Sequence, residues 1–311
     1  RRAKELGAAV HFDMEQYQYK DQTLATLKEL LLEDEFRTRR DIGMTLQAYL
    51  RDSLDDLQAL IEWAKERGTP LTLRLVKGAY WDQETIKAVQ KDWEQPVFND
   101  KEATDANYEA MTRLLLENHE HLYAAIGSHN VRSQALAIAI AESLHIPRRR
   151  FECQVLYGMA DKLAKAISDR GYRVRIYCPY GELIPGMSYL IRRLLENTAN
   201  SSFLRQNLEE RPMEELLAEP VMERIKDKGE RLNPDSSSVI LHPLSFKNSP
   251  DTNYADAAHR KEIQVALKIV RQQLGETYLP LIDGEYVQTE SYVDSLNPSR
   301  FSEKVGRIGL I

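Results

Sequence analysis

The chain has 311 residues, 42% of them hydrophobic, which is enough for one large folded domain and a smaller unit. Its formal net charge is −6 and it has no long basic run, so the composition gives no support to a nucleic-acid partner. Its two cysteines, Cys153 and Cys178, form no CxxC pair, which is typical of a protein from a reducing compartment. No apolar run approaches the roughly 20 residues that a membrane span needs.

From residue 1 to about 203, short β-rich runs alternate with longer helical stretches. The predicted strands are 8–12, 42–49, 71–76, 122–127, 151–156 and 172–177. The predicted helices between them include 21–36, 53–68, 105–119 and 133–145. This alternation indicates βαβ units around a parallel sheet, hence an α/β fold.

Polar side chains at the ends of these runs distinguish a barrel from an open doubly wound sheet. They are Asp13, Gln47, Arg74, Lys77, His129, Tyr157 and Tyr177. A (βα)8 barrel collects its active site from many strand ends, whereas a doubly wound sheet uses one switch point, so a TIM-like barrel is favoured. Six strands are predicted rather than eight, and we expect the first two units to lie upstream of Arg1.

The rest of the chain has a different character. Residues 204–236 are charged and then rich in Pro and Ser, which is typical of a linker. Residues 237–311 contain a predicted helix at 256–274 and a predicted β-hairpin around 279–287. This last part is too short to form an enzyme by itself.

The stretch "YCPYGELIPGMSYLIRRLLEN" (177–197) predicts a helix with two faces. We expect its apolar face to pack on the sheet; it comprises Met187, Leu190, Ile191, Leu194 and Leu195. Its polar stripe comprises Tyr189, Arg192, Arg193 and Glu196. That stripe is either a solvated salt-bridge face or a clamp for a small carboxylate, which would bind between two adjacent guanidinium groups.

The stretch "LRLVKGAYWD" (73–82) places a charge inside a predicted buried strand. Arg74 therefore needs an acceptor, either a carboxylate of the core or a bound cofactor. Lys77 could bind phosphate or form a Schiff base, and Gly78 allows close approach of the backbone. His129 is a lone strand-end histidine for which a supporting role is favoured, and the His, Asp and Glu spacing predicts no metal site.

Three motifs now carry a family resemblance. "RLVKGAYWD", "SHN" (128–130) and the helix stretch above resemble the proline dehydrogenase domain of bacterial bifunctional proline utilization A (PutA) flavoproteins, across residues 1 to about 203. "SFKNSPDTNYADAAHR" (245–260), "PLIDGEYV" (280–287) and "SLNPSRFSEKVGRIG" (295–309) resemble the start of the L-glutamate-γ-semialdehyde dehydrogenase domain, of the aldehyde dehydrogenase type, in the same proteins.

The resemblance implies a (βα)8 barrel with non-covalent FAD, which oxidises L-proline to Δ1-pyrroline-5-carboxylate and passes electrons to a quinone. It implies a cytoplasmic protein, peripheral to the inner membrane, and leaves a homo-oligomer open. NAD would serve only the second domain, whose catalytic residues would lie downstream. A strand-end lysine of the proline pocket, and in some members a DNA-binding domain, would lie upstream.

The resemblance also implies residue roles. Arg74 and Tyr177 would be catalytic. The proline pocket would be formed by Arg192, Arg193, Glu196, Tyr189, Tyr80, Asp13 and Leu156. The FAD contacts would come from Arg74, Val76, Lys77, Gly78, Ala79, Gln47, Trp81, Lys101 and His129. Two alternatives stay open: a Schiff-base lyase that uses Lys77, and a fragment without catalytic activity.

Overall fold

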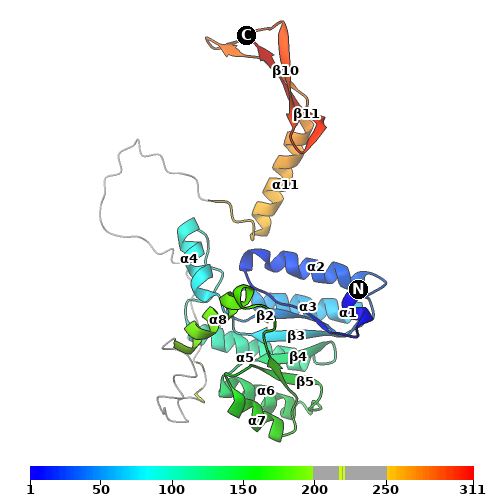
Figure 1. The fold of residues 1–311 in the computed structure, drawn as a ribbon, viewed down its shortest axis with the longest axis vertical. Helices are drawn as coiled ribbons and strands as arrows, with labels where there is room; N and C mark the ends of the chain where they lie inside the picture. Colours follow the sequence, from blue (N-terminus) through cyan, green and yellow to red (C-terminus); the bar gives the residue numbers. More distant parts are fainter. Residues whose placement is uncertain (199–216, 219, 221–250) are drawn as a thin grey trace, which may run out of the picture. The chain divides into compact units, whose positions relative to one another are not determined.

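The computed structural model describes residues 1–198, 217–218, 220 and 251–311 (Figure 1). These residues divide into two compact units, 1–251 and 252–311. The domain boundaries that the sequence predicts, after residues 203 and 236, lie outside the described residues, as does most of the predicted linker.

The first unit is built on six parallel strands that pair in chain order (Figure 1). They are β1 (Val10–Phe12), β2 (Ile42–Gln47), β3 (Leu71–Val76), β4 (Leu122–Gly127), β5 (Phe151–Leu156) and β6 (Val174–Tyr177). The predicted α/β class is confirmed: the six parallel strands of this unit form a curled half-barrel sheet. Strands β1, β2 and β6 are shorter than predicted, since the flanking residues belong to loops.

Helices connect successive strands, as the sequence pattern predicts. They are α2 (Lys20–Leu32), α3 (Ser53–Arg67), α4 (Trp81–Lys91), α5 (Lys101–Glu117), α6 (Val131–Ser143) and α7 (Asp161–Asp169). A short helix α1 (Arg2–Glu5) precedes β1, and a 3-10 turn, η1 (Tyr17–Tyr19), precedes α2. The pattern did not single out α4 and α7, which are short and bury two residues each.

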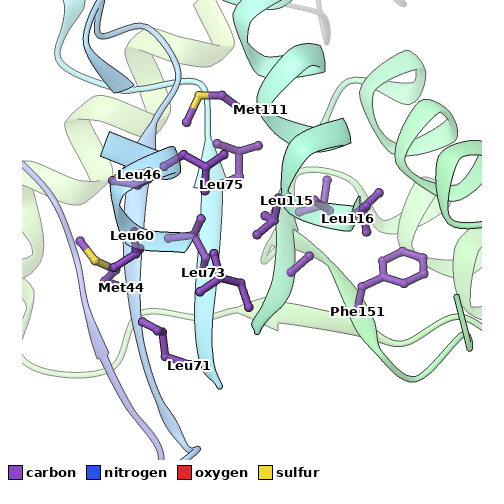
Figure 2. Packing of buried hydrophobic residues seen from close by; sticks show 14 of the residues in the cluster. Met44, Leu46, Leu60, Leu71, Leu73, Leu75, Met111, Leu115, Leu116 and Phe151 are labelled. Carbon is purple, nitrogen blue, oxygen red and sulfur yellow. The ribbon is translucent and has the colours of Figure 1, made fainter. Parts of the chain in front are cut away.

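The main core lies between the sheet and these helices (Figure 2). Residues at alternate positions along each strand point toward the helices because side chains in a strand alternate between its two faces. The labelled residues of this layer are Met44, Leu46, Leu60, Leu71, Leu73, Leu75, Met111, Leu115, Leu116 and Phe151. All are at most 2% exposed, and each fully buried apolar side chain contributes about 1.5–3 kcal/mol to folding.

Helix α8 (Leu183–Thr198) follows β6, the edge strand of the six-stranded sheet. The expectation that its apolar face packs on the sheet is wrong for four of its five residues. Met187, Leu190, Ile191 and Leu194 are all more than 40% exposed, and the side chain of Leu195 lies outside the described part. The physical reason is the edge position, because β6 has a paired neighbour, β5, on one side only among the described strands.

The second unit contains helix α11 (Ala257–Gln272) and five strands. They are β7 (Thr277–Tyr278), β8 (Leu281–Ile282), β9 (Glu285–Tyr286), β10 (Ser291–Asn297) and β11 (Arg300–Leu310). The predicted helix and the short β8–β9 hairpin both form, with Asp283 and Gly284 at positive φ (46° and 87°) in the turn. The antiparallel β10–β11 hairpin, in which β11 also pairs with β7, was not predicted.

Candidate functional site

Most of the site residues that the sequence predicts lie at one edge of the sheet, because the carboxyl ends of parallel strands meet there. Gln47, Val76, Leu156 and Tyr177 are each the last residue of their strand. Residues 77–80 form the loop between β3 and α4, and His129 lies in the loop between β4 and α6. The parallel register therefore brings together side chains that lie more than 100 residues apart in the sequence.

Arg74 of β3 has a carboxylate partner, one of the two acceptors that the sequence left open. Its guanidinium forms an ion pair with Asp13, donates from Nε to Oε1 of Gln154 at 2.8 Å, and lies 5.4 Å from the ring centre of Tyr177. Asp13 also accepts a hydrogen bond from Oγ1 of Thr45 at 3.0 Å. Asp13, predicted to line the proline pocket, thus helps to hold Arg74.

His11 extends this group on the inner face of the sheet, which is the face turned away from the helices. Its Nε2 lies 3.2 Å from Oγ1 of Thr45. Since that hydroxyl donates its only proton to Asp13, Nε2 of His11 must carry a proton and donate it. Burial, and then the charge of Arg74, lower the pKa of His11 to about 4, so the ring is neutral at neutral pH.

Lys77 and Lys101 share one carboxylate. Nζ of Lys77 lies 2.5 Å from Asp105, and Lys101, at the start of α5, lies 4.0 Å from the same group. Burial lowers the pKa of Lys77, although the charge of Asp105 opposes that shift. The ammonium of Lys77 also lies 5.5 Å from the ring centre of Tyr108. The two lysines form a cationic group beside the carboxyl end of β3.

The loop after β3 packs closely against the residues at the end of β2. Gly78 has φ +134°, and a Cβ there would lie 2.5 Å from the ring of Tyr49, so only glycine fits. Gln47 donates from Nε2 to the carbonyl of Met14 at 3.0 Å, while its Oε1 is buried without a hydrogen-bond partner among the described residues. Trp81 donates from its indole to the carbonyl of Phe98 at 2.7 Å.

The two arginines of α8 lie on aromatic rings. Arg192 lies 5.1 Å from the ring centre of Tyr80, and Arg193 lies 5.4 Å from that of Tyr189. Tyr189 stacks on Tyr177, with ring centres 6.2 Å apart and planes 27° apart. A continuous column of rings and guanidinium groups therefore runs from Arg193 through both tyrosines to Arg74 of β3.

Glu196, the last member of the predicted polar stripe, has a side chain outside the described part. Its predicted role in holding the arginines stays a prediction. The contacts of the two arginines with the rings of Tyr80 and Tyr189 differ from those of a freely solvated salt-bridge face.

His129 supports the end of β5. Its Nε2 accepts the backbone N–H of Leu156 at 3.0 Å, so the proton of the neutral ring is on Nδ1. Burial, and then the charge of Arg193, lower the pKa of His129 to about 4. Burial also raises the pKa of Tyr80 to about 12, with the charge of Glu15 acting in the same direction. Both side chains are uncharged at neutral pH.

Several polar residues of the inner face were missed by the sequence analysis. They are His11, Thr45, Glu152 and Gln154, each of which lies between two apolar residues of its strand. A signal was present, because polar residues at every second position of an otherwise apolar strand mark a polar face. The described ranges contain no group of three His, Cys, Asp or Glu residues arranged to hold a metal ion, and none of their helices is long and apolar enough to span a membrane.

Comparison with known proteins defines the class of this α/β half-barrel. The family model described as proline dehydrogenase matches residues 1–206. The chain therefore belongs to the proline dehydrogenase family.

Among relatives, the chain is 33% identical over 228 residues to the bifunctional protein PutA of Escherichia coli K12. This alignment covers 70% of this chain and 17% of that protein. The chain is also 32% identical over 206 residues to proline dehydrogenase 1 of Bacillus subtilis 168. This second alignment covers 66% of this chain and 60% of the Bacillus protein. Each alignment thus spans less than two thirds of the relative.

Among solved structures, proline utilization A from Bdellovibrio bacteriovorus, inactivated by N-propargylglycine, is 44% identical with a TM-score of 0.80. The similarity covers 99% of this chain and 32% of that one, and therefore includes the residues after 206.

Proposed function

We propose that this chain carries the proline dehydrogenase site of a PutA-type protein, in which L-proline is oxidised to Δ1-pyrroline-5-carboxylate with FAD as cofactor. The observation that carries the proposal is the column from Arg193 through Tyr189 and Tyr177 to Arg74, which connects α8 with β3. It brings a candidate carboxylate clamp and a candidate cofactor contact into one site. Membership of the proline dehydrogenase family supports the choice of substrate.

Substrate binding would rest on Arg192 and Arg193. Two neighbouring guanidinium groups bind a carboxylate through charge-assisted hydrogen bonds, each of which contributes about 1.5–3 kcal/mol. Their contacts with Tyr80 and Tyr189 restrict where the guanidinium groups can move, so less freedom is lost when proline binds. Leu156 and the two stacked tyrosines would exclude water from the apolar part of the proline ring.

The residues at the carboxyl edge of the sheet fit a flavin cofactor. The buried Oε1 of Gln47 has no partner among the described residues and could accept from the cofactor. Gly78 lets the backbone approach closely, and Lys77 and Lys101 provide positive charge for phosphate groups. Arg74, Val76, Ala79, Trp81 and His129 would complete the contacts.

The chemistry divides between the protein and the cofactor. FAD, when bound, would accept the hydride that leaves the δ-carbon of proline and would pass the electrons on to a quinone. The protein would bind proline with its ring nitrogen neutral, so that loss of the hydride leaves a protonated C=N bond, which becomes the product when the nitrogen releases its proton to solvent. Arg74, held by Asp13, would place a positive charge where negative charge develops.

We propose further that strands outside this chain complete the half-barrel, and that residues 237–311 begin an aldehyde dehydrogenase-type domain. The similarity of the Bdellovibrio structure to 99% of the chain supports the second proposal. The parent would be cytoplasmic, with peripheral contact to the inner membrane, where a quinone is available; whether it forms a homo-oligomer stays open. Cell fractionation of the full-length protein, with and without proline, tests the location.

The experiment that tests the central proposal is a visible absorption spectrum of the full-length protein before and after anaerobic addition of L-proline. We expect oxidised flavin bands that bleach with proline. The matched control is Arg193→Ala, which should keep the flavin bands but need a much higher proline concentration for bleaching. Flavin bands that do not change with proline would contradict the substrate, and a colourless protein would contradict the cofactor.

One observation favours a second candidate, a Schiff-base lyase. Burial lowers the pKa of Lys77, as a lysine nucleophile requires. Its ion pair with Asp105 opposes this role, because the carboxylate stabilises the ammonium form. Borohydride trapping of Lys77 with a carbonyl substrate would support the lyase, and no adduct at Lys77 would remove it.

A further inference from the structure

A chain of hydrogen bonds runs across the inner face of the sheet below the candidate site. Nε of Arg74 on β3 donates to Oε1 of Gln154 on β5 at 2.8 Å. Nε2 of Gln154 then donates to Oε1 of Glu152 at 2.7 Å. Gln154 is only 6% exposed, so both ends of its amide are bonded inside the protein. The amide thus connects Arg74 to a carboxylate that does not touch Arg74.

The two partners fix the orientation of the Gln154 amide. The guanidinium of Arg74 can only donate, so it requires the amide oxygen. The carboxylate of Glu152 can only accept when ionised, so it requires the amide nitrogen. A reversed amide would place donor against donor and acceptor against acceptor. Gln154 therefore presents its oxygen to Arg74 in one defined position.

Glu152 is anchored from its other side. It is 1% exposed and receives two hydrogen bonds from Arg175 of β6, at 2.6 and 2.9 Å. Burial alone would raise the pKa of Glu152, but the bonds from Arg175 and Gln154 bring the pKa below its ordinary value. The carboxylate is thus ionised at neutral pH, which keeps the direction of the chain of bonds fixed.

The sequence of β4, the strand between, makes this crossing possible. Ala125 of β4 pairs with Arg74 on one side and Glu152 on the other, and its methyl group leaves space above the strand. Gly127 extends this space, since a Cβ there would lie 3.0 Å from Val76 and 3.9 Å from Cγ of Arg74. Ala125 is fully buried although it lies on the inner face. Small residues on β4 therefore let Arg74 reach β5.

We propose that Gln154, supported by Glu152, is a positioning residue that holds the guanidinium of Arg74 in place for the redox step. The proposal rests on the proposed function, in which Arg74 faces the flavin. Asp13 and Tyr177 hold the outer part of the guanidinium, and Gln154 holds Nε, so the group cannot rotate about its last bonds. Proline would bind elsewhere, at the arginines of α8, so loss of the Gln154 bond should slow the reaction more than it weakens binding.

The test compares three variants of the full-length holoenzyme. Gln154→Met keeps the length of the side chain and removes both hydrogen bonds. The double variant Glu152→Gln with Gln154→Glu exchanges the two groups, so that position 154 again accepts from Arg74 and the total charge is unchanged. Tyr123→Phe is the matched control, because Tyr123 donates to the other oxygen of Glu152, at 3.5 Å, outside the chain of bonds to Arg74.

We expect kcat of Gln154→Met to fall about 10- to 100-fold while KM for proline stays within about threefold, as expected when Arg74 loses its one hydrogen bond to Gln154. The flavin midpoint potential should become more negative, because the cation near the reduced ring is less well held. The double variant should recover kcat to within about fivefold of wild type, and Tyr123→Phe should match wild type.

Unchanged kcat and potential in Gln154→Met would overturn the proposal, as would a double variant no better than the single one. A crystal structure of Gln154→Met provides a readout that does not depend on activity. We expect the guanidinium of Arg74 to have left its wild-type position; an unmoved guanidinium would also overturn the proposal. Wild-type protein that fails to bleach with proline would instead contradict the proposed function, and the crystal structure would still decide the role of Gln154.

Discussion

On strand β3, Leu71, Leu73 and Leu75 point toward the helices and are at most 1% exposed. The residues between them, Thr72, Arg74 and Val76, line the inner face and are partly exposed. The same six-residue strand thus supplies a core layer on one side and a candidate site on the other. Because side chains of a strand alternate strictly, each face can be changed with little direct effect on the other.

The two faces are stabilised in different ways. The helix-facing layer depends on close apolar packing, which is non-directional and depends on volume. The inner face depends on directed bonds, such as those from Arg74 to Asp13 and to Gln154, which require particular atoms at particular positions. We therefore expect substitutions on the first face to change mainly stability, and substitutions on the second to change mainly function.

The largest effect is expected from Leu73→Ala. Leu73 is fully buried in the main core, so its truncation leaves a cavity and should lower the free energy of unfolding by about 2–5 kcal/mol. Thr72→Ala, one residue away on the opposite face, should cost less than about 1 kcal/mol. Urea unfolding of both variants measures the difference. Equal losses would show that the two faces are not independent.

Sequence patterns were sufficient for the packed face. Short β-rich runs between longer helical stretches predicted all six strands, and four of those helical stretches predicted α2, α3, α5 and α6. The exposure of the apolar face of α8 could not be predicted in this way. Its amphipathic pattern indicates an apolar face but does not show whether another element covers that face. The exposed Leu190 and Ile191 show that an edge position overrides the pattern.

Sequence patterns were less sufficient for the inner face. Arg74 was recognised as a charge that needs an acceptor, but its partners are 61 and 80 residues away, and only the register of the sheet brings them together. Local sequence contains no information on such distances. The stack of Tyr189 on Tyr177 likewise depends on how α8 returns over the strand ends. The family resemblance named residues for the site, whereas the structure shows how some of them contact one another.

The next largest effect is expected from Arg193→Ala, measured on activity. Loss of one charge-assisted contact to the proline carboxylate should raise KM by about 10- to 100-fold, equivalent to roughly 1.5–3 kcal/mol. Bound flavin, measured by absorbance, should stay the same. Arg173→Ala removes the same charge from an arginine that precedes β6 and bonds to Tyr123, so its KM should match wild type. An unchanged KM in Arg193→Ala would remove the carboxylate-clamp assignment.

A smaller effect is expected from the titration of His11. Its pKa is about 4 in the folded protein and about 6.5 in an unfolded chain, so the unfolded state binds the proton more tightly. The stabilising contribution is therefore complete above pH 6.5 and is lost as the pH falls toward 4, by an amount on the order of 1–2 kcal/mol after allowance for partial exposure.

Urea unfolding of wild type and His11→Gln at several pH values between 7 and 4 checks this prediction. Because carboxylates also titrate in this range, the informative quantity is the difference between the two proteins. We expect wild type to lose stability more steeply than the variant as the pH falls. Parallel curves would mean that the ring of His11 already titrates at its ordinary pKa in the folded protein.

The smallest effect on stability is expected at the solvent-exposed surface, where side chains neither pack in the core nor form buried hydrogen bonds. Lys165 and Asp169 form an ion pair on α7 at 2.7 Å, with side chains 75% and 63% exposed. Water and salt screen such a pair, and the order Lys before Asp is the less favourable one for a helix. Lys165→Ala should therefore change the free energy of unfolding by less than about 0.5 kcal/mol.

Lys162→Ala, three residues earlier on the same helix, is the matched control for loss of charge. If Lys165→Ala costs clearly more than Lys162→Ala, and the excess disappears in high salt, the pair contributes more than its exposure predicts, and the ranking of core, inner face and solvent surface would no longer hold.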